Sequence, residues 1–114
     1  MDKKATVKIL FVCAYGKDRS RTAAELFSHE FQTRYKGLYS NYTALEDILW
    51  ADFIFVMEEY QIQELITKFP ESREKKINCL FIDDSFSYNE PGLISLLKIQ
   101  MEKYMKEIRK SISS

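Results

Sequence analysis

Glycine, proline and cysteine are all scarce in this chain, with three, two and two residues among 114. We find no internal repeat, low-complexity segment or flexible linker that would divide it. The two cysteines, Cys13 and Cys79, lie far apart in the sequence and do not form a disulfide framework, so we expect reduced thiols and a cytoplasmic protein. The chain length predicts one domain, residues 1–114.

An excess of charge of either sign is also missing. Lysine plus arginine equals aspartate plus glutamate at 17 each, which argues against nucleic acid as a partner. No apolar run is long enough to span a membrane, and the apolar stretch after residues 1–4 is too short for a secretory signal, so we expect no membrane partner. The single histidine, His29, indicates no metal site. The remaining composition, 46% hydrophobic and 30% charged, is typical of a globular protein.

Apolar runs alternate with helical patterns along the chain. We expect strands over four segments: 7–12, 38–42, 52–57 and 77–82. We expect helices over four others: 20–35, 43–50, 58–69 and 91–108. Gly37 is expected to end the first helix and Thr43 to cap the second. The alternation predicts a three-layer α/β/α fold around a four-stranded parallel sheet in the order 2-1-3-4.

The junction of the first strand and the first helix carries the most informative motif. Cys13 directly follows the apolar run 9–12, and Arg19 and Ser20 stand where the helix begins. Backbone N–H groups and the positive end of a helix dipole make such a loop bind anions and stabilise a thiolate. The arginine adds a two-pronged donor for phosphate oxygens. This phosphate-binding loop is predicted to contact its oxyanion through Ala14, Tyr15, Gly16, Lys17 and Asp18.

Cleavage of a phosphate ester needs a nucleophile, donors for the phosphate oxygens and an acid for the leaving oxygen. Cys13 is the candidate nucleophile and Arg19 the donor. If the protein does not cleave phosphate esters, Cys13 would be a small buried residue at the end of a strand and Arg19 a solvated residue at the start of a helix. The Ser20 hydroxyl can contact the sulfur or serve as a helix N-cap. Asp83 and Asp84 follow the last strand at the same sheet edge, either as the acid or as part of a solvated turn. No metal or other cofactor is required.

The sequence resembles the low-molecular-weight protein tyrosine phosphatases, especially their short predicted bacterial and archaeal relatives. The matching stretches lie within residues 9–27, 50–58 and 80–97, in the family's order, and span nearly the whole chain. The resemblance implies that Cys13 forms a phosphocysteine and that Arg19 binds the phosphoryl group. It also implies that an aspartate late in the chain is the general acid.

Two features of the family pattern bear on the site. The family's acid is followed by one residue and then an aromatic, as Asp84 is by Phe86, whereas Asp83 is not. Asp84 is therefore the expected acid, with Asp83 in reserve. The family usually has an asparagine that braces the loop and a proline after the Arg-Ser pair, where this chain has Gly16 and Arg21.

We therefore expect a cysteine-dependent phosphomonoesterase, a protein tyrosine phosphatase whose partner is a phosphorylated protein or a small phosphomonoester. Three other functions stay open. The missing asparagine and the acidic Asp18 favour a phosphate- or phosphoprotein-binding module without turnover. A thiol arsenate reductase, which shares this fold, would need resolving cysteines, and only Cys79 is available. A phosphocysteine carrier is disfavoured because Arg19 would hold the phosphoryl group for hydrolysis. A lipid substrate is also open, since residues 16–19 are similar to loops of some lipid-active phosphatases.

Overall fold

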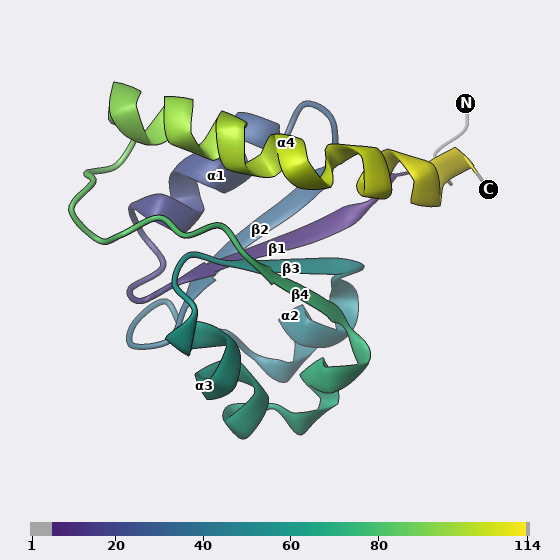
Figure 1. Ribbon diagram of the computed structural model, residues 1–114. Helices are drawn as coiled ribbons and strands as arrows, with labels where there is room; N and C mark the ends of the chain where they lie inside the picture. The colour runs from purple at the N-terminus through teal and green to yellow at the C-terminus, as the bar shows by residue number, and fades with distance from the viewer. Residues whose placement is uncertain (1–5, 114) are drawn as a thin grey trace.

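The computed structural model describes residues 6–113 and confirms the predicted three-layer α/β architecture (Figure 1). One parallel sheet has the order β2-β1-β3-β4, and its strands are β1 (Lys8–Cys13), β2 (Gln32–Gly37), β3 (Phe53–Val56) and β4 (Lys76–Cys79). One face is covered by α1 (Arg19–Phe27) and α4 (Pro91–Ser113). The other is covered by α2 (Leu45–Trp50) and α3 (Tyr60–Lys68), with a 3-10 helix, η1 (Pro70–Glu74), before β4. Residues 1–4, considered above for a secretory signal, lie outside the described residues.

The central strands β1 and β3 are apolar on both faces, as expected for strands covered by helices on each side. Along β1, Phe11 packs into the core shared with α1 and α4, whereas Leu10 and Val12 pack into the core shared with α2 and α3. The Phe11 ring stacks on Phe27 and Phe55 with centroid distances of 6.1 and 5.8 Å. A buried side chain of this size contributes about 1.5–3 kcal/mol. The two cores together fix the position at which β1 ends.

The prediction for residues 20–42 is wrong in two respects. Helix α1 ends at Phe27 rather than near residue 35, and the second strand is β2 rather than residues 38–42. Hydrophobic periodicity does not mark β2 because it is an edge strand with polar, partly exposed side chains. Gly37 consequently ends a strand and not a helix. Phe31 lies in the turn between α1 and β2, and its side chain is buried there.

Two smaller corrections concern the ends of elements. Thr43 does not cap α2, because its hydroxyl donates to the Gly37 carbonyl at 3.0 Å. The cap comes from Asp47, whose carboxylate accepts the Ala44 N–H at 2.9 Å. Strand β4 ends at Cys79 rather than at residue 82 because Phe81 has a φ of +56°, which a strand cannot accommodate.

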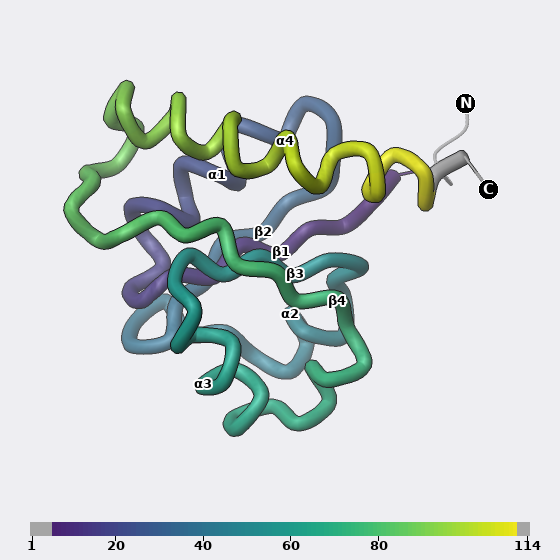
Figure 2. Tube along the Cα trace, in the orientation of Figure 1, coloured from purple at the N-terminus to yellow at the C-terminus, as the bar shows by residue number. Residues whose placement is uncertain are grey.

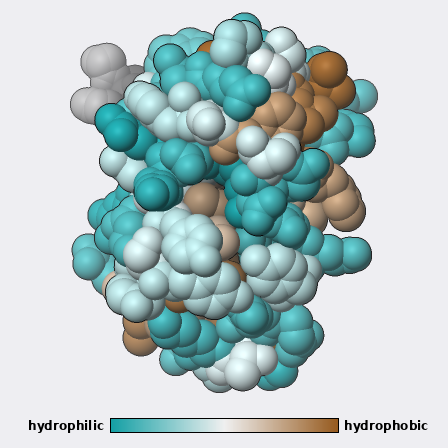
Figure 3. Space-filling model, turned by 90° about the vertical axis from the view of Figure 1, so that its left-hand side faces the viewer, coloured by the Kyte–Doolittle hydropathy of each residue, from teal (hydrophilic) through white to brown (hydrophobic). Residues whose placement is uncertain are grey.

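The carboxyl ends of the strands point to one side of the molecule, the left of Figure 1. The segment between β4 and α4 extends along this side and runs near the loop after β1 (Figure 2). Seen from there, the surface is mainly hydrophilic, with small apolar patches (Figure 3). In the part of the chain that the structure describes, no helix combines the length and apolar character needed to span a bilayer.

Candidate active site

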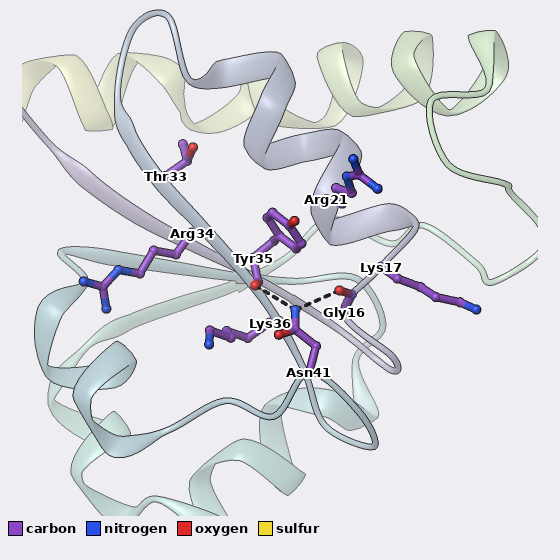
Figure 4. A pocket seen from close by; sticks show the side chains of 8 residues that line it. All are labelled: Gly16, Lys17, Arg21, Thr33, Arg34, Tyr35, Lys36 and Asn41. Carbon is purple, nitrogen blue, oxygen red and sulfur yellow. Dashed lines mark hydrogen bonds between the residues drawn. The ribbon is translucent and has the colours of Figure 1, made fainter.

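The phosphate-binding loop after β1 is held from outside by the loop that follows β2. Two backbone amides of that second loop donate to the Ala14 carbonyl at 2.9 and 2.7 Å, and the Ser40 hydroxyl donates to the Tyr15 carbonyl at 2.8 Å. The Asn41 side-chain amide donates to the Gly16 carbonyl at 2.9 Å (Figure 4). In a trans peptide the N–H points opposite to the carbonyl, so the amides of residues 15–17 turn to the concave side. Such a nest of N–H groups binds anions.

Cys13 lies at the end of β1 and faces this concave side. Its Sγ accepts the Gly16 N–H at 3.2 Å and lies 3.1 Å from the Ser20 hydroxyl oxygen, with which it forms a hydrogen bond. Cys13 is 2% exposed and Ser20 is fully buried. Asp18, and not Ser20, occupies the N-cap position of α1. The Ser20 hydroxyl is therefore available to the sulfur.

Arg19 is a buried cation, 4% exposed, at the first position of α1. Its Nη1 donates to Glu58 Oε2 at 2.6 Å and to the Ile82 carbonyl at 2.6 Å. Burial of a charge is tolerated only when it is paired and hydrogen-bonded. Because Glu58 follows β3 and Ile82 follows β4, these two bonds tie the start of α1 to two neighbouring strand ends.

A cavity of about 110 Å³ brings most of the predicted site residues together. Cys13 and Arg19 line it with Asp84 and Phe86, which come from the loop between β4 and α4. The phosphate-binding loop contributes three further lining residues: Tyr15, Lys17 and Asp18. Gly16 and Ser20 form hydrogen bonds with the sulfur. The Ala14 carbonyl accepts two of the hydrogen bonds that hold the phosphate-binding loop.

The two candidate acids lie in different environments. Asp84 lines the cavity with Cys13, whereas Asp83 lines a neighbouring hollow of about 300 Å³ next to Glu58. The Asp83 carboxylate accepts hydrogen bonds from the hydroxyl and the N–H of Ser85, the latter at 2.9 Å. These bonds hold the pKa of Asp83 below its ordinary value. Asp83 is thereby suited to stay ionised, whereas Asp84 is the aspartate of this pair that shares a cavity with the sulfur.

Asp18 lines the same cavity as the sulfur. Within residues 6–113 it forms no ion pair with Lys17 or Arg21. An acidic side chain at this position reduces the positive potential that an incoming phosphate meets.

The loop between β4 and α4 is fastened to α1 at its far end. The Asn89 N–H donates to Thr22 Oγ1 at 2.8 Å. The Tyr88 hydroxyl donates to the Glu25 carboxylate, and the Arg21 guanidinium carbon lies 4.2 Å from the centroid of the Tyr88 ring. These contacts restrict the position of the segment that carries the candidate acid.

Sequence reasoning missed Asn41 and Glu58. Glu58 lies two residues after the end of β3 and could have been found by the argument applied to Asp84, that acids at the carboxyl ends of parallel strands meet at one edge. Asn41 gives only a turn signal in the sequence. Its φ of +47° lies in the left-handed region that asparagine enters more readily than most residues. It provides a side-chain amide to the loop in which Gly16 replaces the bracing asparagine of the family pattern.

No protein-family model matches this sequence, and no curated protein matches it significantly. Several solved structures match the fold. The tyrosine phosphatase AmsI of Erwinia amylovora has a TM-score of 0.74 at 18% identity, covering 94% of this chain and 97% of its own. A low-molecular-weight protein tyrosine phosphatase from T. tengcongensis has a TM-score of 0.71 at 16% identity, with coverages of 92% and 99%. The YwlE arginine phosphatase from Geobacillus stearothermophilus has a TM-score of 0.61 at 18% identity, with coverages of 94% and 91%. This chain therefore has the fold of the low-molecular-weight protein tyrosine phosphatases over nearly its whole length.

The close approach of Gly37 to the phosphate-binding loop gives a stability test. A Cβ on Gly37 would lie 2.5 Å from the Gly16 nitrogen and 2.5 Å from the Ser40 carbonyl oxygen. Because backbone atoms would have to move, we expect Gly37→Ala to lower the free energy of unfolding by about 1–3 kcal/mol in urea denaturation. Gly92→Ala is the control, since its Cβ would meet only the Phe86 ring at 3.3 Å and the substitution favours helix. Equal losses in the two variants would contradict this role of Gly37.

The fastening of the loop between β4 and α4 gives a pH test. Hydrogen bonds from Tyr88 first, and Arg21 second, lower the pKa of Glu25. A group with a lowered folded-state pKa stabilises the fold above its unfolded pKa, and this stabilisation is lost as pH falls through the folded value. We expect Glu25→Gln to lower Tm at pH 7 and the difference from wild type to disappear below about pH 4. A difference that stays constant down to about pH 3 would show that the carboxylate contributes nothing.

Proposed function

We propose that this protein is a cysteine-dependent phosphomonoesterase of the low-molecular-weight phosphatase family that acts on protein phosphotyrosine. One observation carries the proposal: a sulfur, a buried guanidinium and a carboxyl group, those of Cys13, Arg19 and Asp84, line a single small cavity. Two neighbours of the same fold are named tyrosine phosphatases and a third is named an arginine phosphatase. Their fold supports the class of reaction, and the residues of this chain support its chemistry.

In the first step, the Cys13 thiolate attacks phosphorus. The S–P bond forms as the bond to the leaving oxygen breaks, and Asp84 supplies the proton that this oxygen takes. The Arg19 guanidinium and the amides of the loop hold the other phosphate oxygens, on which charge is spread in the transition state. In the thiolate form the Ser20 hydroxyl and the Gly16 N–H both donate to the sulfur, at the distances given above.

In the second step, water attacks phosphorus in the phosphocysteine. The S–P bond breaks, the thiolate of Cys13 returns, and the carboxylate of Asp84 takes the proton from the attacking water. The same hydrogen bonds to sulfur make it a better leaving group. The products are the free enzyme and inorganic phosphate.

Aromatic side chains at the cavity support an aryl phosphate as substrate. Tyr15 is 55% exposed and lines the cavity, as does Phe86. The Tyr15 ring is also held edge-on by Tyr39, with a centroid distance of 5.8 Å. Aromatic walls of this kind flank planar ligands.

A binding module without turnover is the second candidate. The observation that favours it is Asp18, an acidic side chain at a site for a dianion. The arsenate reductase alternative has less support, because Cys79 packs in the core shared with α2 and α3 while Cys13 packs in the opposite one. Burial raises the pKa of the Cys79 thiol, which makes it a poor resolving nucleophile.

Cys13→Ser tests the nucleophile. We expect this variant to lose at least about 10³-fold in the hydrolysis of p-nitrophenyl phosphate, because a serine hydroxyl is not ionised at neutral pH. Cys79→Ser is the control and should retain activity. We also expect vanadate to inhibit the wild type. If the wild type binds a phosphotyrosine peptide without hydrolysing it, the protein is a binding module and the proposal is wrong. If the Cys13→Ser variant still hydrolyses p-nitrophenyl phosphate, the reaction does not pass through a phosphocysteine.

Asp84→Asn tests the acid. We expect its loss in kcat to be about 10²–10⁴-fold for phenyl phosphate, whose leaving group needs protonation, and much smaller for p-nitrophenyl phosphate. In Asp83→Asn any loss should be the same for both substrates. Steady-state kinetics with the two esters measures the difference. A dependence on the leaving group in Asp83→Asn and not in Asp84→Asn would transfer the role to Asp83.

A further inference from the structure

A second hollow, of about 540 Å³, runs along the outer edge of β2 (Figure 4). It adjoins the active-site cavity, because Lys17 lines both. The described residues that line it include no aspartate or glutamate and four cations: Lys17, Arg21, Arg34 and Lys36. On a chain with zero formal net charge, this is a local concentration of positive charge.

Arg34 and Lys36 do not each have a buried carboxylate of their own to neutralise them. A single buried carboxylate, that of Asp47, serves Arg34 at 3.0 Å and Lys36 at 3.9 Å, and it also accepts the N–H that caps α2. Glu46 lies 3.8 Å from Arg34 but its side chain is 81% exposed, so this pair is screened by water.

The cations on the other side of the hollow, Arg21 and Lys17, are also incompletely neutralised. Arg21 pairs with Glu25 at 3.1 Å, through side chains that are 43% and 48% exposed, and Glu25 is shared with Tyr88. Within residues 6–113, Lys17 has no carboxylate within ion-pair distance. The hollow therefore retains positive charge on both sides of the β2 edge.

The backbone of β2 is open along the same edge. The Gln32 N–H donates to the Val7 carbonyl at 2.9 Å, so every second residue from Gln32 directs its amide toward β1. Thr33 and Tyr35 direct theirs outward. The Tyr35 carbonyl, which points the same way, accepts the Asn41 side-chain amide at 3.1 Å. Because β2 is the last strand on this side of the sheet, nothing in the described chain pairs with the edge before that point.

We propose that this edge binds an extended acidic segment of the phosphorylated protein substrate as an added strand. Successive side chains of a strand point to opposite sides, and the cations stand on both: Arg34 and Lys36 beside α2, and Arg21 on α1. Main-chain pairing gives affinity and side-chain pockets give specificity in this mode of recognition. The inference rests on the proposed function, since Lys17 joins the edge to the cavity that holds the phosphoryl group.

Two matched phosphotyrosine peptides test the inference, one with glutamate and aspartate flanking the phosphotyrosine and one with glutamine and asparagine in their place. The quantity measured is the ratio of their kcat/KM values, in which general effects on catalysis or folding cancel. For wild type we expect a ratio of roughly three to ten in favour of the acidic peptide at low salt, falling toward one in about 0.5 M salt. In the double variant Arg21→Gln, Lys36→Gln the ratio should fall to about one.

The matched control is Lys98→Gln, Lys103→Gln, which removes the same charge from an exposed face of α4 and should keep the wild-type ratio. A ratio of one in wild type would overturn the inference. So would a ratio that persists in Arg21→Gln, Lys36→Gln or one that falls equally in the control.

Binding without catalysis separates this inference from the proposed function. We expect the acidic peptide with phenylalanine in place of phosphotyrosine to shift the amide NMR signals of Thr33 and Tyr35 in wild-type protein. If neither phosphopeptide is hydrolysed, the proposed function is wrong, and these shifts still show whether the acidic peptide binds to the edge of β2. Unchanged signals at Thr33 and Tyr35 would overturn the inference, as would an oligothymidylate that binds more tightly than the acidic peptide.

Discussion

The arrangement of this site depends on the hydrogen bonds made by the buried guanidinium of Arg19. It lies at the start of α1 and is held by Glu58 after β3 and by the Ile82 carbonyl after β4. If the cation lost either partner it would stay buried without full compensation, so the three segments are restrained together. The start of α1 fixes the far end of the phosphate-binding loop, and β1 fixes the near end at Cys13. The position of the sulfur relative to the cation follows from the packing of the sheet.

The conformation of the loop between these two ends is set from outside. Its carbonyls accept hydrogen bonds from the loop after β2, and its amides are thereby turned to the concave side, where the Gly16 N–H donates to the sulfur. Gly16, with a φ of +63°, and Gly37 allow the two loops to approach at a distance that a side chain would prevent. Asn41 completes the contact from the second loop. Asn41 thus braces the phosphate-binding loop from outside, through a hydrogen bond to its backbone.

The parts of the fold that the sequence predicts well are those with a strong apolar pattern. β1 and β3 are buried on both faces, so their runs of apolar residues identify them and place Cys13 at the carboxyl edge. β2 is polar because it is an edge strand, and nothing in its composition separates it from the end of a helix. Glu58 could have been predicted from its position after β3. Asn41 could not, because its role depends on a contact between two loops whose path is set by β2. The choice of Asp84 over Asp83 rests on the family resemblance and stays a prediction; Asp84 lines the cavity that Cys13 lines, and Asp83 lines a neighbouring hollow.

The central claim is that phosphate transfer passes through the sulfur of Cys13, held against Arg19. The most direct measurement is rapid acid quenching of the protein during turnover of p-nitrophenyl phosphate, followed by mass mapping of its peptides. The account predicts a phosphoryl group on the peptide that contains Cys13 and none on the peptide that contains Cys79. Turnover with a phosphoryl group on another residue, or turnover in which no phosphoprotein forms at any time, would contradict it.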